Sequence, residues 1–342
     1  MSKPITTEIL PDNQLDHRAV RAWATLKPPR VKPDAIETLR LKNKSAVYRL
    51  VGVGDDGSSV IAKRCRAATA SVERMMYEEF LPRVPLPSLR YFGHVDEPGD
   101  EYCWLFLESA DGPEYAPSNG AHRSLAARWL AAIQTAAITA NLQSRLPTQD
   151  TNYYLTHLRN ARDTLREHLD NPELHTDDLP NLENLATQFD AIEAHWHELQ
   201  EKCDGLRSTL VHGDFVAKNV RVRVDSSGLA LLVFDWEYAG WGVPATDLSQ
   251  FIGGTVSPDL EVYGALVNGP LRALGGKARG LAECGKIFRL IDDITWATSL
   301  LTFKSYLFLE KPMSYLKSYE PRVAEALREA NWSNANQECS HA

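Results

Sequence analysis

The segment TLVHGDFVAKN (209–219) and the pattern that follows it constrain the fold of this chain more than any other feature. A polar loop, HGDFVAKN, comes after an apolar, strand-like run. Valines then alternate with charged residues in VRVRVD, as in a strand with one buried face. The tripeptide SSG fits a three-residue turn with glycine last, and the returning LALLVFD is apolar enough for burial on both faces. The sequence therefore predicts a strand, a polar loop and a hairpin, in that order.

The predicted register of this hairpin brings polar side chains together. If residues 225 and 229 pair across the turn, Asn219 lies opposite Asp235, with Cβ atoms about 5 Å apart. Asp214 precedes Asn219 by five residues, so two carboxylates and one amide converge. Mg²⁺ prefers such oxygen ligands, and a neighbouring carboxylate can accept a proton from a hydroxyl nucleophile. The pattern indicates phosphoryl transfer, and the alternative is a polar turn between two strands.

The motif HGDFVAKN followed by FDWE resembles the aminoglycoside phosphotransferase and choline kinase superfamily. The loop of that superfamily reads His-Gly-Asp-x-x-x-x-Asn, with a further aspartate downstream, and the resemblance covers roughly residues 35–250 of this chain. It implies an α+β, protein-kinase-like bilobal fold. The expected lobes are a β-rich, nucleotide-binding N-lobe at residues 1–110 and a mostly helical C-lobe at residues 111–342.

The resemblance also assigns roles within the central motif. Asp214 is expected to be the catalytic base, and Asn219 and Asp235 are expected to be metal ligands. Three further residues are implied in support: His212 to brace the loop, Asp247 in ATDLSQF to tie the loop down, and Glu237 as a substrate or metal contact.

In the N-terminal half, the same resemblance identifies residues for the nucleotide. Lys63 in VIAKRC matches the strand-borne lysine that contacts the α and β phosphates. Glu73 is its expected ion-pair partner from spacing, with Glu78 and Glu79 as alternatives.

Two other segments complete the expected nucleotide site. WLFLE, with Phe106 and Glu108, resembles the hinge that lines the adenine pocket. LKNKSAVYRL resembles the loop over the phosphates, with Ser45 nearest them, although it has no glycine. Lys218 is expected to be a solvated side chain, with contact to the γ-phosphate as the alternative.

Hydrophobic patterns and turn residues predict the remaining elements. Strands are expected at 35–41, 45–53, 60–65 and 101–109, a linker at 110–120, and helices at 68–84, 122–143, 151–170, 182–203, 280–310 and 320–331.

Composition excludes several classes of function. A net charge of −8 argues against nucleic acid or an anionic membrane as a partner. No segment is apolar for the length of a membrane helix, and the N-terminus has no apolar signal core, so a cytoplasmic protein is expected. The five scattered cysteines fit reduced thiols. Nothing in the sequence sets the oligomeric state.

These observations predict an ATP- and Mg²⁺-dependent phosphotransferase that acts on a hydroxyl of a small molecule. The first candidate acceptor is an aminoglycoside or another hydroxylated antibiotic, which would give resistance by modification. A choline, ethanolamine or sugar kinase is the alternative. A non-catalytic binding protein of the same fold is a further alternative, although a silent copy has no reason to keep Lys63, Asp214, Asn219 and Asp235 together.

Overall fold

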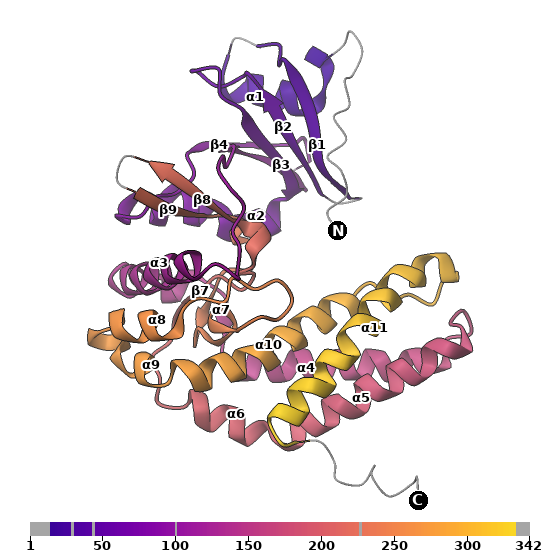
Figure 1. Ribbon diagram of the computed structural model, residues 1–342. Helices are drawn as coiled ribbons and strands as arrows, with labels where there is room; N and C mark the ends of the chain where they lie inside the picture. The colour runs from indigo at the N-terminus through magenta and orange to yellow at the C-terminus, as the bar shows by residue number, and fades with distance from the viewer. Residues whose placement is uncertain (1–13, 29–30, 43–44, 100, 226–227, 333–342) are drawn as a thin grey trace, which may run out of the picture. The chain divides into compact units, whose positions relative to one another are not determined.

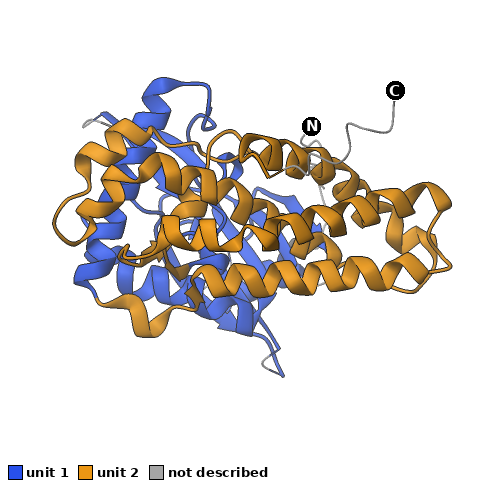
Figure 2. Ribbon diagram, turned by 90° about the horizontal axis from the view of Figure 1, so that it is seen from below, with its two compact units in different colours: residues 1–140, 212–239 blue, residues 141–211, 240–342 orange. Residues whose placement is uncertain are grey.

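The computed structural model describes residues 14–28, 31–42, 45–99, 101–225 and 228–332 (Figure 1). The chain divides into two compact units, of which unit 1 is residues 1–140 with 212–239, and unit 2 is residues 141–211 with 240–342 (Figure 2). The predicted α+β class is confirmed, with a sheet near the N-terminus and helices in most of the rest. These units are discontinuous in sequence, and the division into lobes at residue 110 stays a prediction.

Unit 1 is built on a five-stranded antiparallel sheet with the order β1-β2-β3-β5-β4. Burial alternates along β2, where Ala46, Tyr48 and Leu50 are buried, because successive side chains point to opposite faces. Four of the five strands match the predicted ones, and β4 was not predicted. The strand bounds are β1 Ala35–Lys42, β2 Ser45–Val51, β3 Val60–Arg66, β4 Tyr91–Asp96 and β5 Tyr102–Glu108.

One helix packs on each face of this sheet. Helix α1 (Arg18–Leu26), which the sequence analysis did not predict, buries Trp23 against the rings of Phe92 and Phe106, with centroids 5.4 and 5.2 Å away. Helix α2 (Ala67–Met75) places Ala70 in a second cluster with Cys65 of β3. Lys63 lies two residues before Cys65, so its side chain leaves β3 on the α2 face.

The helix expected at 68–84 is regular only as far as Met75. A π-helical turn (η2, Met76–Phe80) and a 3-10 turn (η3, Leu81–Arg83) follow, and the second contains Pro82. A π-turn inserts one residue into the helical repeat and often occurs beside functional sites. In this chain it begins three residues after Glu73.

The predicted register of the central hairpin is wrong by one residue. Strands β8 (Val220–Asp225) and β9 (Gly228–Val233) pair Asp225 with Gly228, so two residues connect the strands instead of three. The change sets Phe234, not Asp235, beside Asn219, and the Phe234 amide donates to the Asn219 carbonyl oxygen at 3.1 Å. The predicted turn residues 226 and 227 lie outside the described residues.

Helix α3 (Gly120–Thr139) matches the predicted alanine-rich buried helix in unit 1. Its Trp129 stacks on Phe215 with centroids 5.6 Å apart, and contacts Trp236 at 5.9 Å. These rings come from both ends of the central motif, so α3 is a common support for the two loops that flank the hairpin.

Unit 2 is mainly helical. Helices α4, α5, α10 and α11 each pack against two of the others, and Figure 1 shows them side by side in unit 2. A small sheet, β6-β10-β7, lies in the same unit. The bounds are α4 Thr151–Glu167, α5 Leu179–Ala194, α6 Trp196–Cys203, α8 Leu260–Leu266, α9 Arg272–Gly276, α10 Ala278–Thr298, α11 Tyr306–Glu329, β6 Thr148–Gln149, β7 Thr209–Val211 and β10 Gly240–Gly242.

Three helix predictions in unit 2 need correction. The helix expected at 182–203 is two helices, because His195 interrupts it between α5 and α6. The one expected at 280–310 ends at Thr298. The last helix, α11, begins at Tyr306 and continues through Pro312 and Pro321, where proline predicts a break.

Helix α7 (Ala245–Leu248) carries Asp247 and packs tightly against α10. A Cβ at Gly285 of α10 would lie 1.8 Å from the Ala245 carbonyl oxygen, so only glycine fits there. None of the described helices combines the length and the apolar character needed to cross a membrane.

Candidate active site

The loop that begins at His212 depends on a glycine. Gly213 has φ +77°, and a Cβ there would lie 2.3 Å from the carbonyl oxygen of Tyr238. Both the left-handed conformation and the close approach exclude other residues. The loop therefore lies directly against the segment that follows Asp235.

Asp214 and Asn219 are joined within this loop. Asn219 Nδ2 donates to the main-chain oxygen of Asp214 at 3.0 Å and to its Oδ2 at 2.9 Å. A 3-10 turn at Ala217–Asn219 (η7) brings the two residues together, and both are buried. One amide thus fixes the backbone and the carboxylate of the same aspartate.

His212 supports the loop through one hydrogen bond and one ring contact. Its Nδ1 accepts a hydrogen bond from the Asp214 amide at 3.3 Å, and its ring packs against Trp236 with centroids 4.6 Å apart. The side chain is 2% exposed. These contacts suit the bracing role that the resemblance implied.

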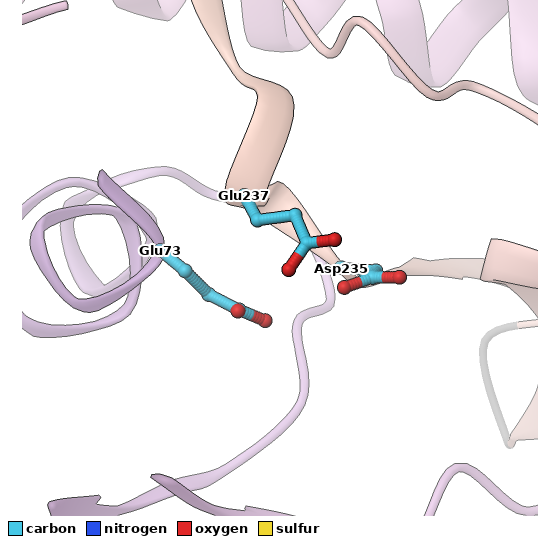
Figure 3. A group of neighbouring side chains, drawn as sticks. All are labelled: Glu73, Asp235 and Glu237. Carbon is cyan, nitrogen blue, oxygen red and sulfur yellow. The ribbon is translucent and has the colours of Figure 1, made fainter. Parts of the chain in front are cut away.

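Lys63 is the centre of the second cluster. Its Nζ lies 2.7 Å from Glu73 Oε2, contacts Asp235 Oδ1, and lies 3.4 Å from Glu237 Oε2. Figure 3 shows the three carboxylates directed toward one region, Glu73 from α2 and the other two from the segment after β9. Their ligand atoms lie within 4.8 Å of one another, a spacing that could hold a metal ion. Lys63 supplies the cation between them.

The ionisation of this cluster follows from burial and charge. Burial opposes the charge of Lys63, but Glu73, Asp235 and Glu237 outweigh it and raise the pKa of Lys63 well above 10.5. Burial raises the pKa of Glu73 to about 7, against the influence of Lys63. The pKa of Asp235 is lowered although burial opposes this, because Lys63 both attracts its charge and donates to it. Lys63 and Asp235 are therefore a charged pair.

Glu78, one of the two alternatives to Glu73, has other neighbours. Glu78 Oε1 accepts from the Tyr91 hydroxyl at 2.9 Å and lies 3.3 Å from His94 Nδ1. Glu73 is instead 1% exposed beside Lys63. The ion pair that forms is the one that spacing favoured.

Asp235 has a left-handed backbone, with φ +69° and ψ +60°. A residue with a side chain adopts this conformation at a cost, and such strain concentrates at functional sites. The charge of Asp214 acts to raise the pKa of Asp235, so the two carboxylates are close enough to repel each other. A divalent cation with oxygen ligands would offset that repulsion.

Phe106 and Glu108, the residues expected at the hinge beside the adenine pocket, have different surroundings. The side chain of Phe106 is completely buried in the α1-side core, so any contact of Phe106 with a base would involve its main chain. Adjacent residues of a strand face opposite sides, and Phe106 faces away from Lys63. Glu108 Oε1 binds Arg223 Nη2 of β8, and its Oε2 accepts from the Arg90 amide at 2.9 Å. Any contact of Glu108 with a base would therefore involve its main chain.

The expected phosphate loop falls where β1 is followed by β2. Ser45 begins β2 and pairs with Lys42, the last residue of β1. Residues 43 and 44 of the predicted loop lie outside the described residues. Ser45 is thus at the β1–β2 connection, and its expected place nearest the phosphates stays a prediction.

Sequence reasoning missed Arg40 of β1. Its positive charge adds to the lowering of the Asp235 pKa and opposes the rise in the pKa of Tyr238. Arg40 follows a bulge in β1, where the register with β2 shifts between Thr38 and Arg40. A bulge changes the direction of later side chains, and the sequence alone gave no signal for it.

Asp247 lies in unit 2 and is buried there. Asp247 is 2% exposed. Burial is the main cause that raises the pKa values of Tyr154 and Tyr263, and the charge of Asp247 adds to the rise. These neighbours show where Asp247 is held within unit 2. Its expected role toward the catalytic loop stays a prediction.

A family model connects these residues to known proteins. The model described as the phosphotransferase enzyme family matches residues 38–281, which is more than half of the chain and includes both clusters. Comparison with curated protein sequences finds no match.

Solved structures with the same fold include several phosphotransferases. A GDP complex of wild-type aminoglycoside 2'-phosphotransferase-IIIa has a TM-score of 0.60 and 12% identity, covering 90% of this chain and 99% of that one. A putative aminoglycoside phosphotransferase from Ralstonia eutropha JMP134 has a TM-score of 0.56 and 15% identity, covering 92% and 98%. Choline kinase from Cryptosporidium parvum Iowa II has a TM-score of 0.51 and 12% identity, covering 87% and 91%.

The identities are low, so these likenesses establish the kinase-like fold alone. The family match covers the loop with Asp214, the strand with Lys63 and the segment with Asp235. The chain therefore belongs to the phosphotransferase enzyme family and is an enzyme of the small-molecule kinase type.

Proposed function

We propose that this enzyme transfers the γ-phosphoryl group of ATP to a hydroxyl of a small molecule, with Mg²⁺ as cofactor. The observation that carries the proposal is the pair of Asp214 and Asn219, bonded at 2.9 Å within a buried loop of unit 1. The same unit holds the charged pair of Lys63 and Asp235. A base, phosphate-binding cations and metal ligands are the parts that phosphoryl transfer requires.

Asp214 would accept a hydrogen bond from the acceptor hydroxyl and direct its oxygen at the γ-phosphorus. As the new O–P bond forms, the bond from the γ-phosphorus to the β,γ-bridging oxygen breaks and ADP leaves. The hydroxyl proton passes to an Asp214 carboxylate oxygen. Asn219 keeps that carboxylate in place through Nδ2, and positioning of this kind supplies much of the rate in such reactions.

The donor set suits Mg²⁺. Asp235 would supply a carboxylate oxygen, and Asn219 would supply Oδ1, because its Nδ2 donates to Asp214. When bound, the ion would neutralise charge on the phosphates. Lys63 would contact the α and β phosphates while Glu73 holds its ammonium group, and Ser45 would lie over them at the β1–β2 connection.

The first candidate acceptor is an aminoglycoside or another hydroxylated antibiotic, which would give resistance by modification. Solved structures of the same fold carry such molecules, one with kanamycin and GDP and one with streptomycin and ATP. A choline, ethanolamine or sugar kinase is the second candidate, favoured by the likeness to choline kinase.

A phosphorylation screen read by mass spectrometry tests the function. The purified protein, ATP and Mg²⁺ are incubated with aminoglycosides, other hydroxylated antibiotics, amino alcohols and sugars, and Asp214→Asn is the control. A phosphoryl mass gain on one compound, absent with the control, would identify the acceptor class. If no compound gains mass but Mg²⁺ and ATP raise the melting temperature, the acceptor lies outside the panel. If nucleotides do not bind at all, the proposed function is wrong.

A further inference from the structure

Lys218 has a partner in the structure that its sequence position did not predict. Its Nζ lies 3.2 Å from Asp214 Oδ2, although its side chain is 67% exposed. The same oxygen accepts the hydrogen bond from Asn219. Lys218 is therefore an ion-pair partner of the proposed base.

The backbone at Lys218 is fixed while its side chain is exposed. The 3-10 turn closes with a bond from the Asn219 amide to the Val216 carbonyl oxygen at 2.9 Å. Arg221 Nη1 also donates to the carbonyl oxygen of Lys218 at 3.4 Å. The turn thus directs the lysine stem back toward Asp214, and only the flexible side chain is able to change its partner.

Among the described residues of unit 1, two lysines contact the candidate catalytic carboxylates, and their side chains differ in freedom to move. Lys63 is buried among three carboxylates, so its ammonium group stays where it is. Lys218 forms a single ion pair with Asp214 at the solvent side, and exposed pairs of this kind are weak and easily exchanged. A lysine has three donors on a flexible stem, which suits a cation that changes from one anion to another.

Phosphoryl transfer brings two anions close to Lys218. The acceptor hydroxyl lies between the Asp214 carboxylate and the phosphorus. Only the acceptor oxygen then separates the carboxylate from the phosphoryl group, so the two anions are close together. A cation already in contact with that carboxylate is placed to contact both. We propose that Lys218 is a catalytic residue that bridges Asp214 and the transferring phosphoryl group. This inference rests on the proposed function.

Two variants and one control test the bridge. Lys218→Met removes the ammonium group and keeps the stem, and Lys218→Arg keeps the charge. Lys27→Met is the matched control, because Lys27 is also a lysine of unit 1 with a partly exposed side chain, and it pairs with a carboxylate, Asp55, at 3.6 Å. The rate is measured with the acceptor identified in the screen and, in parallel, with water. The dissociation constant of Mg²⁺–ATP is measured by calorimetry.

The expected result separates rate from binding. Lys218→Met should lower kcat by roughly tenfold or more, since it removes a contact that forms fully only during transfer. The affinity for Mg²⁺–ATP should stay nearly unchanged, because Lys63 and the metal hold the other phosphates. Lys218→Arg should recover part of the rate, and Lys27→Met should behave as wild type.

Two outcomes would overturn the inference, and they are distinguishable. If kcat of Lys218→Met equals that of the wild type, the lysine is a solvated side chain and the proposed function still stands. If the wild-type protein transfers phosphoryl groups to no acceptor, water included, and also fails to bind Mg²⁺–ATP, the proposed function fails and the inference fails with it.

Discussion

Asn219 donates from one amide nitrogen to both the main-chain oxygen and Oδ2 of Asp214, at 3.0 and 2.9 Å. Two bonds from a single group fix the backbone and the carboxylate together. The orientation of the proposed base is therefore set by the fold before any substrate binds.

Asp214→Asn should remove turnover and keep nucleotide binding. The amide has the size of the carboxylate but takes up no proton, so kcat should fall by roughly 100- to 10,000-fold. Steady-state rates and Mg²⁺–ATP calorimetry measure the two quantities. An unchanged melting temperature would show that the fold is intact, and full activity would contradict the assignment of the base.

Asp235→Ala should remove the Mg²⁺ dependence of nucleotide binding. The change deletes a proposed metal ligand, while Lys63 keeps Glu73 and Glu237 as partners. Calorimetry with Mg²⁺ and with a chelator should then give the same affinity. Asp111→Ala, at an exposed carboxylate of unit 1, is the control and should keep the difference.

Glu73 should make nucleotide affinity depend on pH. Because burial raises its pKa from 4.5 to about 7, Glu73 is mostly protonated below that pH, and Lys63 then has one charged partner fewer. Affinity for Mg²⁺–ATP should rise as the pH increases through about 7. Glu73→Gln should bind more weakly and lose this component, so the difference between the two profiles excludes titration of the nucleotide itself.

Glu73 should also affect stability, which should fall with increasing pH where the affinity for Mg²⁺–ATP rises. A carboxyl whose pKa is higher in the folded state binds its proton more tightly there, so its contribution to stability falls as the pH rises from 4.5 to about 7. Thermal unfolding of the wild type and of Glu73→Gln over this range measures the contribution. Parallel curves for the two proteins would contradict the raised pKa.

Gly213→Ala should destabilise the fold more than Gly205→Ala. Both glycines have left-handed backbones, with φ +77° and +71°, so both changes carry a conformational cost of about 1 kcal/mol. At Gly213 the new Cβ would also meet the Tyr238 carbonyl oxygen at 2.3 Å, whereas nothing lies within 4 Å at Gly205. Denaturant unfolding of both variants gives the comparison, and equal losses would contradict the close approach.

A second glycine pair tests the support of Asp247. Gly285→Ala places a Cβ 1.8 Å from the Ala245 carbonyl oxygen and should force α7 and α10 apart, lowering stability and activity. Gly280→Ala in the same helix meets nothing within 4 Å and should be neutral or stabilising by up to about 1 kcal/mol. The melting temperature of Gly285→Ala should be lower than that of Gly280→Ala, and the opposite order would contradict the close approach of α7 and α10.

The sequence predicted most of unit 1 because its signals are local. Strand-like runs on either side of the turn DDGSS predicted β2 and β3, and the family resemblance, with the spacing of Glu73 to YFG, predicted its ion pair with Lys63. The hairpin register failed because a turn of two residues and one of three read alike in SSG. Asp235 still reaches Lys63, since its left-handed backbone sets its direction and the strand register does not.

The other side-chain positions in the candidate site could not be predicted from sequence patterns. Phe106 was assigned to the adenine pocket from its motif, but which face of β5 it occupies depends on where α1 packs. The direction of the Arg40 side chain depends on a bulge in β1. The contact of Lys218 with Asp214 depends on the 3-10 turn that carries Lys218. Each is a property of backbone direction, which tertiary packing decides.

The division of unit 1 into two stretches of sequence affects how the protein is made. Lys63 and Glu73 leave the ribosome long before residues 212–239, which complete the same unit. Until then Trp129 has neither Phe215 nor Trp236 beside it, and Lys63 is without Asp235. In a nascent chain of 140 residues, Lys63 therefore has Glu73 as a partner but lacks Asp235 and Glu237. Cleavage at that point would leave Lys63 on one fragment and Asp214 on the other.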